Sequence, residues 1–412
     1  MKILNFGSCN IDTVYRVDHI TQPGETNAAE SVENFPGGKG LNQSVALAKA
    51  GAKVYHAGCI GPDGGMLTQV MTKYGVDLRY LRTVDEKTGH AIIQVSKSGE
   101  NGIIVYPGAN GLVTRAYIDS VLGNFCAGDF LLVQNEISEL QYLVEKAAER
   151  GMRVVLNPSP YHESLKKMDL GLIYCVILNE LEAVSVFGSQ DPGEIQCFLN
   201  EHQPDLQVVL TLGKNGSAHV TKDRIHRQGA YCVENVDTTA AGDTYTGYFI
   251  AGISKGKTAK SAMRYASAAS ALAISKKGAA SSIPLIEDVE KQLETLCPYA
   301  LNTPDKQKEV VARFLEAHYS DGTLEMLAKK LGYTPSYTSN WLVSNMEATF
   351  TGLMQRKKCE VCAKYLLNTS LSVSEIIEKI GYRNESHFRK IFQAEYGCTP
   401  LKYRQRMGSK HE

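Results

Sequence analysis

The sequence predicts an α/β domain with a mainly parallel central sheet, followed by a smaller all-α domain. In residues 1–290, short β-branched runs alternate with longer helical patterns, which is typical of βαβ units. After a polar break that contains proline, every remaining pattern is helical. The chain is therefore divided into an α/β domain, a linker and a helical domain, at residues 1–296, 297–305 and 306–407.

Individual elements follow from the residue patterns. The apolar runs at residues 154–156, 176–178 and 208–211 are predicted to be buried strands. Residues 141–150 and 263–275 have helical periodicity. Gly-rich and Asp-rich connections follow the strands, and α/β sheets bind ligands at that edge.

Two further strands are predicted at residues 91–95 and 102–106, joined by a polar turn. They interrupt the alternation of strands and helices. A hairpin in this position is expected to form a small β lid over a binding site.

Composition and charge favour a soluble, cytoplasmic protein. Hydrophobic residues make up 43% of the chain, and no run approaches the ~20 apolar residues of a membrane span. The N-terminus resembles a strand rather than an export signal, and ten scattered cysteines suit a reducing compartment. Residues 301–412 hold 17 Lys and Arg against 12 Asp and Glu, whereas the remainder holds 27 against 32. This difference favours contact between the tail and a polyanion, although chance variation in composition is an alternative.

The clearest chemical pattern is Val-Asp-Thr-Thr-Ala-Ala-Gly-Asp-Thr-Tyr, at residues 236–245. Small residues at Ala240, Ala241 and Gly242 leave backbone N–H groups free to bind an anion at a helix start. Such a turn can stabilise the charge on a phosphoryl group during transfer. Asp243 at its edge can accept the proton of an attacking hydroxyl group. From this segment alone, the alternative is that Asp243 is an N-cap after a tight turn.

A second segment, Pro-Gly-Gly-Lys-Gly-Leu-Asn at residues 36–42, precedes a predicted helix at 43–50. Its glycines allow the backbone to approach a ligand closely, and the amide of Asn42 suits sugar hydroxyl groups. The spacing of a P-loop is absent. By itself the segment is weak evidence, because a simple strand-to-helix turn has the same pattern.

Together, these segments resemble the PfkB/ribokinase family of carbohydrate kinases. Both family signatures are present, GGKGLNQSVALAKAGAKVYHAGCIGPD at residues 37–63 and DTTAAGDTYTGYF at 237–249. Further motifs are LNPSP at 156–160, NELEA at 179–183, TLGKNG at 211–216 and KKGAASSIP at 276–284. The resemblance implies a ribokinase-like fold and ATP-dependent phosphorylation of a small sugar, with D-ribose as the expected substrate and ribose 5-phosphate as the product. It also implies a homodimer that forms through the lid strands.

The resemblance assigns roles to individual residues. Asp243 would be the catalytic base, and Ala240, Ala241 and Gly242 would form the anion hole. The sugar would be bound by Asn10, Asp12, Gly38, Lys39, Asn42, Glu136 and Asp243. The nucleotide would be bound by Asn179, Thr211, Gly213, Gly216 and Gly242. Glu182 would help to organise Mg²⁺, and K⁺ would be bound by a pair of loops that contains Asp237, Thr239, Ala273, Lys276, Gly278 and Ser282.

The tail shows a helix-turn-helix pattern twice. Residues 323–332 and 373–382 are each predicted to form a short helix ending in glycine, and helices at 335–345 and 385–394 follow. The ending GYRNESHFRKIFQAEYGCTPLKYR resembles the AraC/XylS family of transcription regulators, in which a long helix, here 351–367, joins the two units. This resemblance implies sequence-specific binding of double-stranded DNA.

In that family, the second helix of each unit enters the major groove. The residues that would contact DNA are Ser336, Ser339 and Asn340 in the first unit, and Arg383, Asn384, Glu385, His387, Arg389 and Lys390 in the second. Arg389 suits guanine and Asn384 suits adenine. Arg383, Lys402 and Arg404 are expected to contact phosphates. The alternative is that these polar residues are only solvated helix faces.

A C-x-x-C pair, Cys359 and Cys362, lies inside the long helix. Its spacing puts both thiols on one face, and no second pair accompanies it. A core position is therefore favoured over a metal or redox role.

The resulting hypothesis is a bifunctional protein, a sugar kinase whose sugar occupancy changes DNA binding. One alternative is a catalytically idle, sugar-sensing regulator, which the presence of Asp243, Asn179 and Glu182 argues against. The other is a kinase with a vestigial tail.

Overall fold

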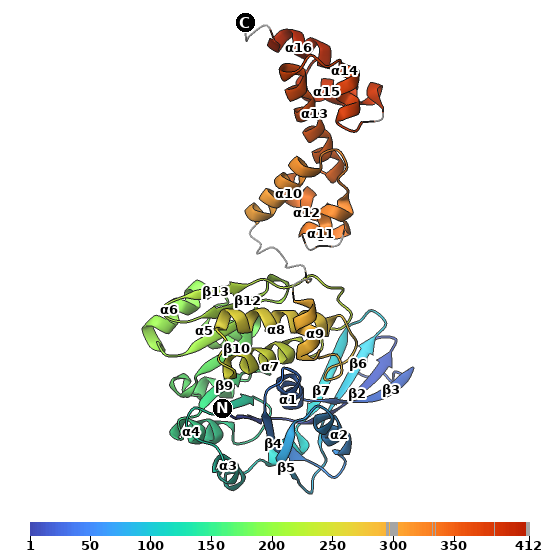
Figure 1. The fold of residues 1–412 in the computed structure, drawn as a ribbon. Helices are drawn as coiled ribbons and strands as arrows, with labels where there is room; N and C mark the ends of the chain where they lie inside the picture. The colour runs from blue at the N-terminus through green and yellow to red at the C-terminus, as the bar shows by residue number, and fades with distance from the viewer. Residues whose placement is uncertain (294–295, 297–303, 332, 334, 383, 409–412) are drawn as a thin grey trace. The chain divides into compact units, whose positions relative to one another are not determined.

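The computed structural model describes residues 1–412 except 294–295, 297–303, 332, 334, 383 and 409–412 (Figure 1). It forms two compact units, Met1–Cys297 and Pro298–Glu412, and each is considered by itself. Most of the predicted linker at 297–305 lies outside the described residues. The predicted domain bounds at 1–296 and 306–407 remain a prediction.

The first unit is built on a nine-stranded sheet in the order β13-β12-β11-β10-β9-β8-β1-β4-β5. From β11 to β5 all neighbouring strands are parallel, and β12 and β13 continue antiparallel. The strands are β1 (Ile3–Phe6), β4 (Val54–Ile60), β5 (Asp77–Thr83), β8 (Phe130–Gln134), β9 (Arg153–Asn157), β10 (Cys175–Asn179), β11 (Gln207–Thr211), β12 (Ser217–Val220) and β13 (Ile225–Gln228). The central strands are almost wholly buried, as expected of a parallel sheet that is covered on both faces.

Helices cover both faces of this sheet (Figure 1). One apolar core lies under α1 (Lys39–Lys49), α2 (Gly65–Lys73), α7 (Ala241–Ser254), α8 (Ala259–Ile274) and α9 (Ile286–Gln292). The other lies under α3 (Arg115–Leu122), α4 (Leu140–Glu149), α5 (Glu180–Phe187) and α6 (Pro192–His202). Successive strand residues alternate between these cores, because side chains along a strand point to opposite faces. Short 3₁₀ helices η1 (Gly108–Leu112), η2 (Glu163–Lys167), η3 (Leu170–Leu172) and η4 (Gly213–Asn215) lie in the connections.

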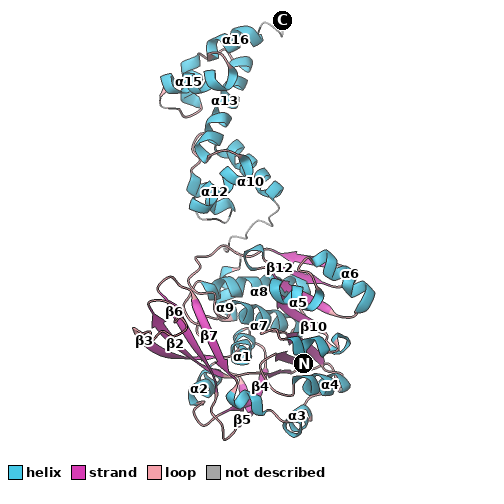
Figure 2. Cartoon of the chain, turned by 180° about the vertical axis from the view of Figure 1, so that it is seen from behind, coloured by secondary structure: helices cyan, strands magenta, loops and turns pink. Residues whose placement is uncertain are grey.

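A separate four-stranded sheet projects from the first unit (Figure 2). Its order is β3 (Ser31–Gly37), β2 (Asn10–Val17), β6 (Gly89–Ser96) and β7 (Asn101–Tyr106). The predicted hairpin is confirmed as β6 and β7, which pair antiparallel. The sequence did not indicate β2 and β3, which add a second antiparallel pair to the lid.

The second unit is entirely helical in its described residues. Its helices are α10 (Pro304–His318), α11 (Leu324–Leu331), α12 (Pro335–Met346), α13 (Phe350–Asn368), α14 (Val373–Lys379), α15 (Glu385–Tyr396) and α16 (Pro400–Gly408). One small core joins α10, α11 and α12 to the start of α13, and another joins the rest of α13 to α14 and α15. The two predicted helix-turn-helix units are therefore α11–α12 and α14–α15, and α13 contributes to both cores.

Cys359 and Cys362 lie in the second of these small cores and have no exposed surface. Burial raises the pKa of both thiols to about 12, so both remain neutral. Among the described residues, no three His, Cys, Asp or Glu side chains gather as a metal site would require. The predicted core position is confirmed.

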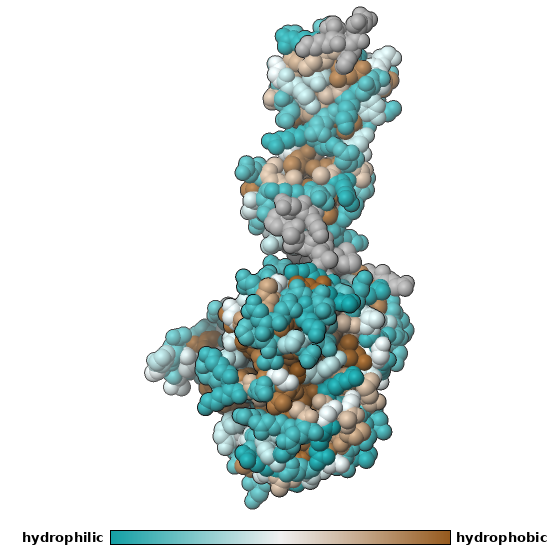
Figure 3. Space-filling model, turned by 90° about the vertical axis from the view of Figure 1, so that its left-hand side faces the viewer, coloured by the Kyte–Doolittle hydropathy of each residue, from teal (hydrophilic) through white to brown (hydrophobic). Residues whose placement is uncertain are grey.

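No described helix combines the length and the apolar character that crossing a membrane requires. On the face shown in Figure 3, hydrophilic residues cover much of each unit.

Candidate active site

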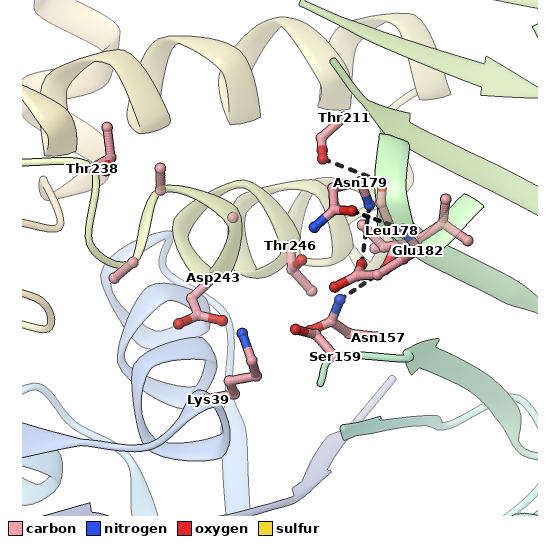
Figure 4. Close-up of a pocket in the computed structure, with 14 residues that line it drawn as sticks. Lys39, Asn157, Ser159, Leu178, Asn179, Glu182, Thr211, Thr238, Asp243 and Thr246 are labelled. Carbon is pink, nitrogen blue, oxygen red and sulfur yellow. Dashed lines mark hydrogen bonds between the residues drawn. The ribbon is translucent and has the colours of Figure 1, made fainter. Parts of the chain in front are cut away.

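A cavity of about 260 Å³ opens at the carboxyl edge of the sheet (Figure 4). The last residues of three adjacent strands line one side, namely Asn157 of β9, Asn179 of β10 and Thr211 of β11. Lys39 at the start of α1 lies opposite them, with the turn from Ala240 to Asp243 at the start of α7. The two Gly-rich segments that are about 200 residues apart in the sequence therefore meet at one ligand-binding edge.

The turn before α7 has the geometry of an anion-binding site. Ala240 occupies the N-cap with φ of 60°, and no side chain caps the helix. The first bond of the α-helical pattern joins Thr244 N to Ala240 O at 2.8 Å, so the N–H groups of Gly242 and Asp243 precede it. These donors, together with the positive end of the helix dipole, can hold an anion.

The carboxylate of Asp243 is 8% exposed and is fixed from both sides by α1. Asn42 Nδ2 donates to its Oδ2 at 3.1 Å, and Gln43 Nε2 donates to its Oδ1 at 2.9 Å. The alternative that Asp243 is an N-cap is wrong, because Ala240 holds that position.

The remaining sugar candidates lie around this carboxylate. Asn10 is buried and accepts from Asn110 Nδ2 at 2.8 Å. Glu136 accepts hydrogen bonds from Ser8 Oγ and from Lys39 N. A Cβ on Gly37 would lie 2.0 Å from Asp12 Oδ2, so only glycine lets strand β3 pass this carboxylate.

The ionisable groups of this pocket influence one another. Burial, with smaller contributions from Glu136 and Asp243, raises the pKa of Asp12 to about 7. Burial likewise raises the pKa of Glu136. Burial alone would lower the pKa of Lys39, but attraction by Asp243, Glu136 and Glu182 outweighs burial and raises it. This region therefore keeps the Lys39 cation among several carboxylates. Of the residues predicted to bind the sugar, Lys39 and Asp243 line the cavity, whereas Asn10, Asp12, Gly38, Asn42 and Glu136 are not among its lining residues.

Asn179 and Glu182 form a capping box at the start of α5. Asn179 Oδ1 accepts from Glu182 N at 2.9 Å, and Glu182 Oε2 accepts from Asn179 N at 3.0 Å. Both residues line the cavity. Carboxylate and amide oxygens are suitable partners for hydrated Mg²⁺, so these two residues fit the role that the resemblance gives them.

The predicted nucleotide residues divide into two groups. Thr211 and Gly242 line the cavity beside Asn179. Gly213 and Gly216 lie in the turn directly after β11 and do not line it. A Cβ on Gly216 would lie 2.0 Å from Gln228 O, so this glycine is required by backbone packing.

The two predicted K⁺ loops lie side by side. Asp237 accepts from Gly278 N and Thr239 N, each at 2.9 Å. Val236 N and Asp237 N both donate to Ile274 O. The other candidates, Ala273, Lys276 and Ser282, belong to the second of these joined segments. These hydrogen bonds hold the two segments predicted to bind K⁺ against each other.

In the helical unit, α12 and α15 are the second helices of the two helix-turn-helix units, which we call the reading helices. The first of them, α12, exposes Ser336 and Asn340, and Ser339 is half-buried. On α15, Asn384 is the N-cap and accepts from His387 N at 3.0 Å. Arg389 is paired with Glu385, whereas Lys390 is exposed. Arg383 lies outside the described residues.

Two further contacts refine the predicted DNA interface. Tyr382 Oη lies 3.1 Å from His387 Nδ1. Arg404, expected at a phosphate, instead donates to Leu366 O and Leu371 O, so its guanidinium fixes the end of α13. Lys402 is exposed and remains available for a phosphate contact.

Comparison with known proteins decides the family. A model of the pfkB family of carbohydrate kinases matches residues 1–286. The chain belongs to this family. A model of a helix-turn-helix domain of the AraC type matches residues 327–406. The protein is therefore an ATP-dependent carbohydrate kinase of the PfkB family that also carries an AraC-type helix-turn-helix domain.

Its relatives include several ribokinases. The ribokinase of Haemophilus influenzae is 36% identical over 297 residues, which cover 70% of this chain and 97% of that protein. The ribokinase of Staphylococcus aureus is 34% identical and covers 70% and 99%. The structure of Arabidopsis thaliana ribokinase complexed with ribose and ATP has a TM-score of 0.63 at 30% identity, over 71% of this chain and 98% of that one. The structure of the Cryptococcus neoformans enzyme in complex with ADP gives the same TM-score and identity, over 71% and 99%.

Several residues of this PfkB site were not singled out from the sequence. Gln43 and Asn157 contact each other beside Asp243, and Asn110 holds the amide of Asn10. Gln43 and Asn157 lie inside the recognised motifs at 37–63 and 156–160, so motif membership was a signal that could have identified them.

Proposed function

We propose that the protein phosphorylates D-ribose to ribose 5-phosphate and binds specific DNA sequences as a transcription regulator. The observation that carries the kinase part is the position of Asp243. Its carboxylate lies between the sugar candidates Asn42 and Asp12 and the anion-binding turn. Ribose is supported by the identity to several ribokinases and by the Arabidopsis structure with ribose and ATP.

In the proposed mechanism, Asn10, Asp12 and Asn42 bind the ribose hydroxyl groups. Asp243 accepts the proton of the primary hydroxyl group as that oxygen attacks the γ-phosphate of ATP. The backbone N–H groups of the turn at 240–242 stabilise the negative charge of the transferred phosphoryl group. Lys39, held positive by its carboxylate neighbours, adds to this stabilisation.

Two cations complete the proposed site. Mg²⁺, organised through Glu182 and Asn179, would neutralise phosphate charge when it is bound with the nucleotide. K⁺ would occupy the joined loops around Asp237 and Gly278. Because Asp237 lies three residues before Ala240, a cation there would fix the backbone from which the anion-binding turn begins.

The regulatory part rests on the helix-turn-helix domain. Lys390 of α15 and Ser336 and Asn340 of α12 expose polar side chains on the two reading helices. We also assign a homodimer that forms through the lid, because strand β7 exposes Ile103, Ile104, Val105 and Tyr106. Sugar binding closes the lid and thereby alters how the dimer contacts DNA. A reducing cytoplasm suits this activity, and Cys9, Cys59 and Cys175 are buried free thiols.

Turnover of ATP by the intact protein tests the kinase proposal on a panel of pentoses, hexoses and nucleosides. We expect ribose to give the highest kcat/KM. Absence of turnover with every sugar, together with sugar-dependent DNA binding, would establish the idle sensor instead. Equal DNA affinity with and without sugar and nucleotide would contradict the coupling. Absence of salt-dependent DNA binding would leave a kinase with a vestigial tail.

A further inference from the structure

A chain of buried amide side chains leads across the sheet edge to Asp243. Its members are Asn5 of β1, Gln43 of α1, Gln134 of β8 and Asn157 of β9. The first three are at most 1% exposed, and Asn157 is 9% exposed. Of the four, only Asn157 lines the cavity. The chain therefore lies behind the residues that would contact substrate, and its effect must be exerted through them.

The hydrogen bonds of this chain are continuous. Gln43 Nε2 donates to Asp243 Oδ1 at 2.9 Å and to Asn157 Oδ1 at 3.0 Å. Gln43 Oε1 accepts from Gln134 Nε2 at 2.6 Å. Gln134 Nε2 also donates to Asn5 Oδ1, at 3.0 Å. Both N–H groups of Gln43 and both N–H groups of Gln134 are thereby used, so neither amide can rotate without losing two hydrogen bonds.

The direction of these bonds follows from Asp243. An ionised carboxylate only accepts hydrogen bonds, so Gln43 must present its NH₂ group to Asp243 and its carbonyl oxygen to Gln134. Gln134 must then present its own NH₂ group to Gln43. Its Oε1 is consequently left buried and without a hydrogen-bond partner among the described residues.

The unpartnered oxygen, Gln134 Oε1, lies close to the backbone of Gly7. A Cβ on Gly7 would lie 2.2 Å from Gln134 Oε1, so the neighbouring backbone leaves room for it only because residue 7 is glycine. A buried acceptor without a partner costs about 1–3 kcal/mol. The network tolerates this cost on Gln134, while both donors of Gln43 are used and both oxygens of Asp243 accept hydrogen bonds. Among the described residues, Asn42 Oδ1 is also buried without a partner, so the contacts that are complete are those that hold the carboxylate itself.

We propose that Gln43, held in place by Gln134, is a positioning residue that fixes the orientation of the Asp243 carboxylate for proton transfer. The proposal rests on the role of Asp243 as the base. It gives the adjacent residues Asn42 and Gln43 separate tasks. Asn42 donates to one carboxylate oxygen and faces the sugar, whereas Gln43 donates to the other and faces the sheet.

The effect of Gln43 on Asp243 follows from its N–H donor. Without that hydrogen bond, Asp243 Oδ1 loses its partner, and the carboxylate can rotate away from the orientation that proton transfer requires. The other charged groups that act on this site are Lys39 from α1, Asp12 from β2, Glu136 after β8 and Glu182 from α5. All four are retained in the variants below, so they act equally in each.

The test uses the full-length protein and compares Gln43→Met, Gln134→Met and the control Gln196→Met. Gln196 also donates through its amide to two acceptors, Thr221 O and Lys222 O, but it lies on α6 and does not belong to the hydrogen-bonded network of amides around Gln43. Thermal unfolding first establishes that each variant is folded. The values of kcat and of the sugar KM are then measured separately, with ATP and ribose or whichever sugar proves best.

For Gln43→Met we expect kcat to fall by about 10- to 100-fold with little change in KM, because misorientation affects the chemical step. Gln134→Met lowers kcat in the same way but by less, and it serves as the test if Gln43→Met does not fold. Gln196→Met leaves both kcat and KM unchanged.

The proposal is overturned if the folded variants keep the wild-type kcat, if KM rises in place of a fall in kcat, or if Gln196→Met lowers kcat equally. Asp243→Asn, measured in parallel, separates this failure from a failure of the proposed base. If Asp243→Asn loses activity while Gln43→Met keeps the wild-type kcat, only the positioning role is wrong. If Asp243→Asn retains activity, the base assignment itself is wrong and the positioning role falls with it.

Discussion

Asn42 Nδ2 lies 3.1 Å from Asp243 Oδ2, although 201 positions separate the two residues in the chain. Asn42 belongs to the first Gly-rich segment and Asp243 to the second. Their hydrogen bond joins the start of α1 to the turn that begins α7.

Asp12 makes the stability of the kinase unit depend on pH. Its pKa is raised in the fold from 3.8 to about 7, so the folded protein binds more protons at this site than the unfolded chain. Its contribution to the free energy of unfolding therefore falls as pH rises through that window. We expect Asp12→Asn to raise Tm above pH 7, to leave it unchanged near pH 4, and to weaken sugar binding.

A matched substitution on the exposed end of the lid gives the control. The pKa of Asp18 is lowered by hydrogen bonds from Lys97 and His19, which is the opposite direction. Because this shift favours the folded state at high pH and Asp18 is exposed, Asp18→Asn is expected to leave Tm at high pH unchanged or to lower it slightly. Differential scanning calorimetry at both pH values measures the difference, and an equal rise in Tm for both variants would contradict the account of Asp12.

Ala240 tests the backbone geometry of the anion-binding turn. Its φ of 60° is unfavourable for residues with a Cβ, most of all for β-branched ones. Ala240→Gly is expected to keep kcat and to stabilise the fold by up to about 1 kcal/mol. Ala240→Val should lower kcat by about 10-fold or more, because the N–H groups turn away from the phosphoryl group. Steady-state kinetics with Tm measurements distinguish the two, and equal kcat values would count against the turn.

Two arginines of the helical unit should behave differently. Arg389 lies on the reading helix α15, where its guanidinium can leave the ion pair with Glu385 and bind a DNA base. Arg404 instead donates to the backbone at the end of α13. We expect Arg389→Ala to lower affinity for DNA selected by the intact protein by about 1–3 kcal/mol, without lowering Tm. Arg404→Ala should lower the Tm of the helical unit instead, because two carbonyl groups lose a charged donor. Fluorescence anisotropy and calorimetry separate these effects, and the reverse pattern would exchange the two roles.

The strands and helices that could be predicted are those whose residue pattern lies within one short, continuous segment of the sequence. The run Val208–Leu210 is buried on both faces and is apolar throughout, so β11 could be identified from composition alone. Strands β2 and β3 gave no such signal, because they lie in the lid, where polar and apolar residues are both half-exposed or exposed.

The same distinction applies to the residues of the candidate site. Asp243 and Asn42 could be identified because each lies in a recognisable motif. Gln134 could not, since its partner Gln43 is 91 positions away and no local pattern links a lone amide to a distant carboxylate. The pairing of Arg404 with backbone carbonyl groups was also beyond reach, because a basic residue beside a reading helix suits phosphate equally well.

The most direct test of the central claim is a comparison of the intact protein with Asp243→Asn, using ATP and ribose. Titration calorimetry would measure ribose binding, and a coupled assay would measure kcat. The carboxamide retains the shape of the side chain but cannot act as a base, so we expect kcat to fall by at least ~10²-fold while ribose still binds. Unchanged kcat in this variant would contradict the assignment of Asp243 as the group that activates the sugar hydroxyl.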